Sequence, residues 1–294
     1  MGSTCAFIFL DHREDKYINE KLQFYRSVFP KDPFYLIVNT ARIPVLAREL
    51  IDNVTIITVY QDKLYQGGYL AAALYMMPTI PRSIIDYQIR VPSIIVESDL
   101  EVCRRNIKDR VHDLVSGGRI GMCCFKAKPP KDHEFHNNDF RIMHMHKAAF
   151  DTDQPIAATT LGGSVMTYAG AKAICELYEQ PRVQAYYQYL LEMAHNYESG
   201  RVWEIPYAAQ YFTDYFFPSA CKLAGLSLAD SINHIIPRYN YQAGETVDVD
   251  SYDEVLDALN DERMYVIHHL SRNYERFPGA FTGLDLVREA MLNE

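Results

Sequence analysis

Two carboxylates stand one residue apart at the end of an apolar run, in the segment Glu97-Ser98-Asp99. The preceding residues, Ile94-Ile95-Val96, are mostly β-branched and predict a buried strand. Carboxylates are costly to bury unless they are paired, protonated or bound to a cation, and ligands usually bind at the carboxyl edge of an α/β sheet. Mg²⁺ and Mn²⁺ take carboxylate oxygens and complete their shell with phosphate and water. The segment therefore fits a divalent-metal site for a phosphate ligand, or equally a solvated loop after a core strand.

Other polar groups stand where further elements are expected to begin or end. Asp11-His12-Arg13 follows the first apolar run, and His268-His269 ends a late one. Gly162-Gly163 supplies backbone without side chains, which allows either the close approach of a ligand or a tight bulge. Glu204 follows the only tryptophan, Trp203, just before an expected helix. A carboxylate there either complements the helix dipole, which is the simpler interpretation, or acts as a catalytic base beside a ring that stacks on a sugar.

Histidines in the middle of the chain form a further group of potential metal ligands. Alternating polarity over residues 140–146 predicts a strand that would carry His144 and His146 on one face. Together with His133 and His136 they match no recognised ligand spacing. A structural role is therefore favoured over a hydrolytic metal centre.

The elements that would position these groups alternate between strands and helices. Apolar runs predict strands at 5–10, 34–38, 54–59, 94–97, 119–125, 140–146 and 264–270. Helical spacing and capping signals predict helices at 17–28, 43–51, 64–77, 106–115, 169–179, 182–197, 207–224, 251–259 and 284–292. This alternation favours a parallel sheet with right-handed crossovers. No Gly-x-Gly-x-x-Gly or Walker-type lysine loop follows the first strand, which argues against dinucleotide-binding and P-loop proteins.

The composition excludes several other classes. The chain has 294 residues, of which 48% are hydrophobic and 23% charged, as in a soluble globular protein. A formal charge of −9 argues against a protein that wraps nucleic acid. The six cysteines form no CxxC pair, which favours reduced thiols and a cytoplasmic chain. No apolar run approaches the roughly 20 residues of a membrane span, and the sequence leaves monomer and homodimer open.

The order of the motifs resembles the GT-A glycosyltransferases, which use a nucleotide-sugar donor and a divalent metal. Glu97-Ser98-Asp99 stands where the family has Asp-x-Asp, and Leu161-Gly162-Gly163-Ser164 is similar to its Gly-Gly strand start. Glu204 follows as an acid at a helix edge, and Ile267-His268-His269 resembles the family's Ile-His-Pro-Val-Lys type of strand ending. The likeness spans nearly the whole chain.

The resemblance implies one GT-A-like, Rossmann-like domain over residues 1–294, with a central, mostly parallel mixed sheet flanked by helices. Residues 1–118 would form the half that binds the nucleotide sugar, and residues 119–294 the half that binds the acceptor. The implied reaction moves a hexose or pentose from a nucleoside-diphosphate sugar, with a UDP-sugar favoured, to a glycan hydroxyl.

The resemblance also implies roles for individual residues. Mn²⁺ or Mg²⁺ would be held by Asp99, Glu97 and His268, although a slip of one residue would select His269, and it would stabilise the departing phosphate. Glu204 would be the general base of an inverting reaction. Donor binding would involve Asp11, Arg13, Glu97, Asp99, Gly162, Gly163 and Arg272, with the two arginines contacting phosphate.

Two other functions remain open. A nucleotidyltransferase would share the acid-x-acid segment, but it usually has a glycine-rich basic loop after the first strand, and residues 11–15 contain no glycine. A non-catalytic carbohydrate-binding domain would keep the same fold without turnover. An assay of donor hydrolysis separates this last class from a transferase.

Overall fold

The computed structural model describes residues 3–11, 13–39, 43–59, 74–75, 78–98, 100–123, 137–152, 156–157, 159, 162–201, 203, 207–229, 233–235, 252–268 and 283–294. The strands are β1 (Ala6–Leu10), β2 (Phe34–Asn39), β3 (Val54–Val59), β4 (Ser93–Glu97), β5 (Leu100–Val102), β6 (Ile120–Cys123), β7 (Val165–Met166), β8 (Ser227–Ala229), β9 (Asn233–Ile235) and β10 (Val266–His268). The helices are α1 (Asp15–Val28), α2 (Arg48–Ile51), α4 (Thr79–Asp86), α5 (Ile107–Ser116), α6 (Asn137–Phe150), α7 (Tyr168–Tyr178), α8 (Pro181–Glu198), α9 (Tyr207–Gln210), α10 (Phe212–Leu223), α11 (Tyr252–Asn260) and α13 (Gly283–Asn293).

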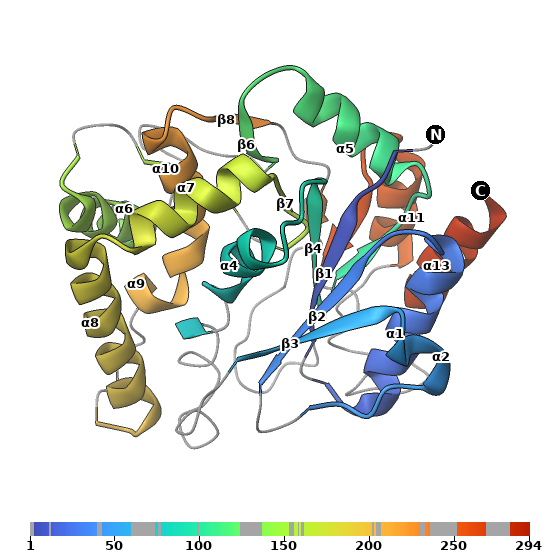
Figure 1. Ribbon diagram of the computed structural model, residues 1–294, viewed down its shortest axis with the longest axis horizontal. Coiled ribbons are helices and arrows are strands. Elements are labelled where there is room, and N and C mark those ends of the chain that lie inside the picture. The colour runs from blue at the N-terminus through green and yellow to red at the C-terminus, as the bar shows by residue number, and fades with distance from the viewer. Residues whose placement is uncertain are drawn as a thin grey trace.

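Seven of the described strands form one central sheet in the order β3-β2-β1-β4-β7-β6-β8. Neighbours are parallel except at β7, which runs antiparallel to both β4 and β6. Figure 1 shows α4, α7 and α10 on one side of this sheet and α1 and α13 on the other. The predicted fold class, an α/β domain with a mostly parallel mixed sheet flanked by helices, is confirmed.

A second, small sheet lies beside the carboxyl end of β4. Its order is β5-β10-β9, with β10 antiparallel to β5 and parallel to β9. The chain enters this sheet directly from the central one, because β5 begins at Leu100 and β4 ends at Glu97. A late segment, β10, is thereby joined to the turn that follows the fourth strand.

Alternation along β1 builds a core on each face of the central sheet. Phe7 and Phe9 pack with Tyr25 of α1, and the Phe9 and Tyr25 ring centroids lie 5.1 Å apart, edge to face. Ile8 and Leu10 face the opposite way and belong to the core under α4, α7 and α10. The apolar run that predicts this strand is therefore buried on both sides, as expected of a central parallel strand.

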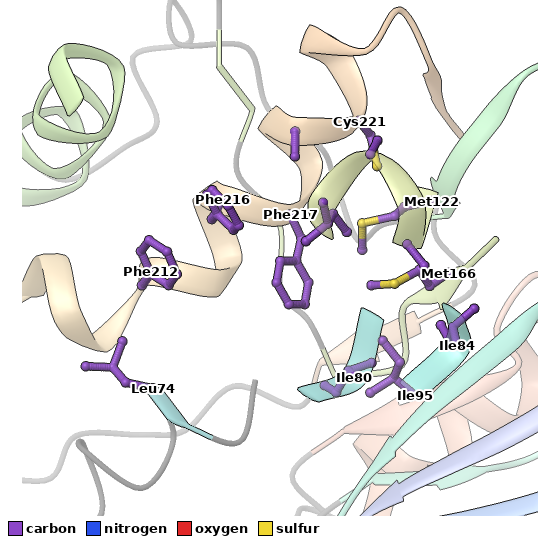
Figure 2. Packing of buried hydrophobic residues seen from close by; sticks show 14 of the residues in the cluster. Leu74, Ile80, Ile84, Ile95, Met122, Met166, Phe212, Phe216, Phe217 and Cys221 are labelled. Carbon is purple, nitrogen blue, oxygen red and sulfur yellow. The ribbon is translucent and has the colours of Figure 1, made fainter. Parts of the chain in front are cut away.

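The second core is packed between the sheet and the helices of the later half. Met122 and Met166 are paired in register across β6 and β7, and Figure 2 shows them between the sheet and α10. Along α10 the Phe212 and Phe216 rings stack with their centroids 4.8 Å apart. Figure 2 also shows Ile95 of β4 close to the side chains of α4, so the strand that leads to the acidic segment is anchored in this core.

One predicted strand is wrong. Residues 140–146 belong to α6, where the buried residues are Ile142, Met143, His146 and Phe150. Ile142, His146 and Phe150 recur every four residues and Met143 lies three residues before His146, which is the helical period, whereas Ile142 and His146 taken alone also fit alternation over seven residues. The helix separates the two histidines expected on one face, because His144 is exposed and His146 is buried.

Other differences are smaller. The expected helix 43–51 is reduced to α2, because the α1 side chains Asp15 and Asn19 accept hydrogen bonds from the backbone N–H groups of Val45 and Ala47. The expected helix 207–224 is divided at Tyr211 into α9 and α10. The helix α4 and the strands β5, β8 and β9 were not predicted. The expected helix 64–77 falls almost entirely outside the described residues.

The first turn of α7 packs directly on β6, which makes Gly170 intolerant of a side chain. A Cβ at Gly170 would stand 2.1 Å from the carbonyl oxygen of Gly121. We expect Gly170→Ala to lower the free energy of unfolding by about 3 kcal/mol, because overpacking against backbone outweighs the gain in helix propensity. Urea unfolding measures the difference. The control is Gly117→Ala, where a Cβ meets nothing within 4 Å. Equal effects of the two substitutions would contradict the packing of α7 on β6.

The buried histidine of α6 predicts a pH dependence of stability. His146 packs among aromatic rings, including those of Phe150 and Tyr186, and burial lowers the pKa of its imidazole from 6.5 to about 3. Between these pH values the His146 imidazole is protonated in the unfolded chain and neutral in the folded chain. The free energy of unfolding therefore falls as the pH drops below 6.5. Relative to His146→Phe, the wild type should lose roughly 2 kcal/mol between pH 6.5 and pH 5.

Urea unfolding of both proteins across this pH range checks the expectation. His144→Gln is the matched control, because that side chain is exposed on the same helix and its removal should leave the pH dependence unchanged. Identical slopes for the wild type and His146→Phe would show that His146 is not the source.

Candidate functional site

The carboxyl ends of β1 and β4 lie side by side. Their parallel register pairs Leu10 with Glu97, so Asp11 follows one strand where Ser98 follows the other. In an open α/β sheet this edge is where ligands bind. Two segments separated by more than eighty residues of chain, and singled out for their polar groups, thus meet at one edge.

Asp11 and Arg13 form a bidentate ion pair at this edge. The Arg13 guanidinium donates from Nε to Asp11 Oδ1 at 2.9 Å and from Nη2 to Oδ2 at 2.6 Å. Burial alone would raise the pKa of Asp11, but the hydrogen bonds and charge of Arg13, together with the charge of Lys21, outweigh it and lower the pKa below 3.8. Asp11 is thus an anion that orients Arg13, and both side chains are largely buried.

A lysine of α1 donates hydrogen bonds to the backbone of the turn between β4 and β5. The Lys21 Nζ donates hydrogen bonds to the backbone carbonyl oxygens of Glu97 at 2.8 Å, Ser98 at 3.3 Å and Leu100 at 2.6 Å. The Lys21 side chain is 2% exposed. One of these carbonyls belongs to Glu97, and the other two belong to the residues on either side of Asp99. Asp99 itself lies outside the described residues.

The counter-charge for Lys21 comes from the strand that leaves the turn. Glu101 of β5 is buried, and its Oε1 lies 3.4 Å from Lys21 Nζ and 3.8 Å from Arg288 Nη2 of α13. Tyr25 belongs to the same cluster, because its hydroxyl accepts a hydrogen bond from the backbone N–H of Val102 at 2.8 Å. Burial, reinforced by the negative charge of Glu101, raises the pKa of Tyr25 well above 10.

The histidine strand reaches the same turn. In the antiparallel pairing of β10 with β5, His268 stands opposite Leu100, the residue after Asp99. The backbone of His268 is described, and its side chain is not. The backbone alone therefore brings a predicted metal ligand from the end of the chain to the acidic turn.

The glycine pair forms a bulge against β4. The backbone N–H of Gly163 donates to the carbonyl oxygen of Ile95 at 3.1 Å, and the N–H of Ile95 donates to the carbonyl oxygen of Ser164 at 2.9 Å. Two residues thus face one, and Gly163 has a φ of 72°, which favours glycine. Of the two uses expected of Gly162-Gly163, the structure shows the bulge. Its partner on β4, Ile95, lies two residues before the acidic segment.

The described site residues thus share one edge: Asp11, Arg13, Glu97, Gly162 and Gly163 with the backbone of His268. The predicted residues Asp99, Glu204, His269 and Arg272 lie outside the described part of the chain. Within the described residues, no group of three or more His, Cys, Asp or Glu side chains is arranged to hold a metal ion. Asp99 and the His268 side chain do not enter that comparison.

Sequence reasoning missed the residues beneath the turn, namely Lys21 and Glu101. A signal for Lys21 existed, because it lies on the apolar stripe of α1 that includes Ile18, Leu22 and Tyr25. A charged residue on a buried stripe needs a partner, but the helix does not say which one. Glu101 gave no signal, because its burial depends on β5.

No known family and no curated protein matches the sequence. Among solved structures, the galactosyltransferase LgtC in complex with donor and acceptor sugar analogs is 11% identical, with 97% of this chain and 96% of that chain covered and a TM-score of 0.46. A glycosyltransferase involved in the glycosylation of the major capsid of PBCV-1 is 9% identical, with 98% of each chain covered and a TM-score of 0.40. Mouse xyloside xylosyltransferase 1 is 12% identical, with 90% of this chain and 96% of that chain covered and a TM-score of 0.36.

The chain is therefore similar over nearly its whole length to structures of glycosyltransferases, the class that its motifs resemble. No helix in the described part of the chain combines the length and the apolar character that a bilayer crossing needs.

The Asp11–Arg13 pair predicts an acid-sensitive share of stability. Asp11→Asn should lower the free energy of unfolding by about 3 kcal/mol at pH 7, because it removes the carboxylate charge that pairs with the largely buried guanidinium. Since the folded pKa of Asp11 lies below 3.8, its contribution is complete above that pH and is lost as the pH falls through the folded value. Urea unfolding should show the wild type and the variant converging at low pH. A difference that stays constant with pH would contradict the assigned charge.

Proposed function

We propose that the chain is a metal-dependent glycosyltransferase that moves a hexose or pentose from a nucleoside-diphosphate sugar, with a UDP-sugar favoured, to a glycan hydroxyl. One observation carries the proposal. The pairing of β10 with β5 brings the backbone of His268 beside the turn that contains Glu97 and Asp99. Two carboxylates and an imidazole are a ligand set that Mn²⁺ accepts.

The side chains proposed as metal ligands at this turn suit a divalent cation. The carbonyl oxygens of Glu97, Ser98 and Leu100 accept hydrogen bonds from Lys21, so a cation at the turn would be held by the carboxylates of Glu97 and Asp99 and by His268. Mn²⁺ or Mg²⁺ bound there supplies Lewis-acid stabilisation of the departing phosphate.

The donor would lie along the edge formed by β1 and β4. Arg13 presents a guanidinium oriented by Asp11, and Arg272 would add a second contact to phosphate. The bulge at Gly163 would line the sugar pocket, because its φ of 72° excludes most side chains and leaves backbone alone at that point. Residues 1–118 would thus form the donor half.

The acceptor would be bound by residues 119–294. Trp203 is 95% exposed, and its ring offers a flat face on which an acceptor sugar stacks. Glu204, the next residue, would take the proton of the acceptor hydroxyl in an inverting reaction. The composition adds the expectation of a cytoplasmic protein that acts without nucleic acid.

The test is a thermal shift of the wild type with Mn²⁺ and each of UDP, GDP and CMP. Binding to the native state raises the midpoint by mass action, and a nucleotide present at a hundred times its Kd should raise it by about 5 °C. We expect a shift with UDP that requires Mn²⁺ and is lost in Asp99→Ala. Asp113→Ala, which removes an exposed carboxylate of α5, is the control and should keep the shift.

Each result has a consequence. A metal-dependent shift with another nucleotide would keep the transferase and change the donor class. The absence of any shift in the wild type would contradict the metal site at Glu97 and Asp99, and with it the proposed function.

A further inference from the structure

Lys21 is the most unusual buried group in the described part of the chain. It lies on the buried stripe of α1, one helical turn from Ile18 and from Tyr25, with a side chain that is 2% exposed. Burying an ammonium is costly unless it is paired and hydrogen-bonded. An apolar residue at this position would fill the same stripe without that cost, so the burial of a charge here needs a specific explanation.

The contacts of Lys21 are concentrated on one short segment. Lys21 donates hydrogen bonds to the backbone carbonyl oxygens of Glu97, Ser98 and Leu100, in the turn that carries the proposed metal ligands Glu97 and Asp99. The turn is the crossing between the central sheet and the small sheet, where the chain passes from β4 to β5. The ammonium thus contacts carbonyl oxygens on both sides of this crossing.

The geometry also favours lysine over other cations. An ammonium is a compact point charge with three donors, whereas an arginine guanidinium is a planar fork suited to carboxylates. The carbonyl oxygens of Glu97, Ser98 and Leu100 converge on Nζ and match the ammonium. Glu101 balances the charge, with its Oε1 at 3.4 Å from Nζ.

We propose that Lys21 is a positioning residue for the metal site. Its hydrogen bonds fix the backbone of the 97–100 turn, so that the carboxylates of Glu97 and Asp99 are ordered before the cation binds. This role rests on the proposed function. Lys21 acts through the backbone of the turn and does not touch the metal or the donor. Glu101 is required for the burial of Lys21, and not for the site itself.

A purely electrostatic role of Lys21 predicts the opposite sign from a positioning role. Removing a positive charge near a divalent cation strengthens cation binding, because the repulsion between them disappears. Removing a brace that holds the ligands weakens binding, because the turn must be ordered at the expense of binding energy. The direction of the change in Mn²⁺ affinity therefore separates the two roles.

The experiment compares Glu101→Gln with the double variant Lys21→Met/Glu101→Gln. Lys21→Met alone would leave Glu101 buried without its nearest cation and would risk unfolding, whereas in Glu101→Gln the ammonium keeps its hydrogen bonds to three backbone carbonyl oxygens. The double variant removes both charges and keeps the side-chain volumes close to the originals, so the pair differs only in the ammonium. Lys16→Met, an exposed lysine of the same helix, is the control for the loss of one positive charge.

Two quantities are measured on each folded protein: the Mn²⁺ dissociation constant by calorimetry, and the hydrogen–deuterium exchange of the backbone amides of residues 97–102. We expect the double variant to bind Mn²⁺ at least tenfold more weakly than Glu101→Gln, with faster exchange in the turn. Lys16→Met should match the wild type in both.

An Mn²⁺ affinity that is unchanged or increased in the double variant, with unaltered exchange, would overturn the proposal and leave Lys21 as a stabilising ion pair only. If the wild type binds no Mn²⁺ with or without UDP, the proposed function fails. The exchange comparison then still decides whether Lys21 orders the turn.

Discussion

The hydrogen bonds from the buried ammonium of Lys21 to the turn between β4 and β5 are the interaction on which the site depends. At that turn the chain leaves the central sheet and enters the small one. A side chain of α1 donates hydrogen bonds to carbonyl oxygens on both sides of this crossing. Because the ammonium is buried, the turn cannot exchange these bonds for water without the cost of an unpaired charge.

The same turn joins the two ends of the chain. Glu101 meets Lys21 from α1 and Arg288 from α13, and Glu294 pairs with Arg104 just after β5 at 3.1 Å. The proposed metal site is therefore held between the first helix and the last, with β10 beside it. Under the proposed function, metal binding and stability would be coupled here, because Lys21 and Arg288 of the C-terminal helix share the carboxylate of Glu101.

Local patterns predicted the elements whose signal lies within their own residues. The strands from β1 to β4 and the helices α1, α5, α7 and α8 follow from apolar runs and helical spacing. The strand predicted at 140–146 failed because Ile142 and His146, four residues apart, fit both periods over so short a window. The three-residue strands β5, β8 and β9 were missed because they are strands only through partners far along the chain.

The sequence by itself determined that Glu97 ends a buried strand, because the β-branched residues before it favour a buried strand, and that Gly162-Gly163 supplies backbone without side chains. Only the tertiary structure decided that Lys21 lies under the acidic turn, that Glu101 balances it, and that His268 is paired opposite Leu100. The physical reason is that burial and periodicity are properties of neighbouring residues. The partner of a buried charge or of a short strand is chosen by the folding of the whole chain.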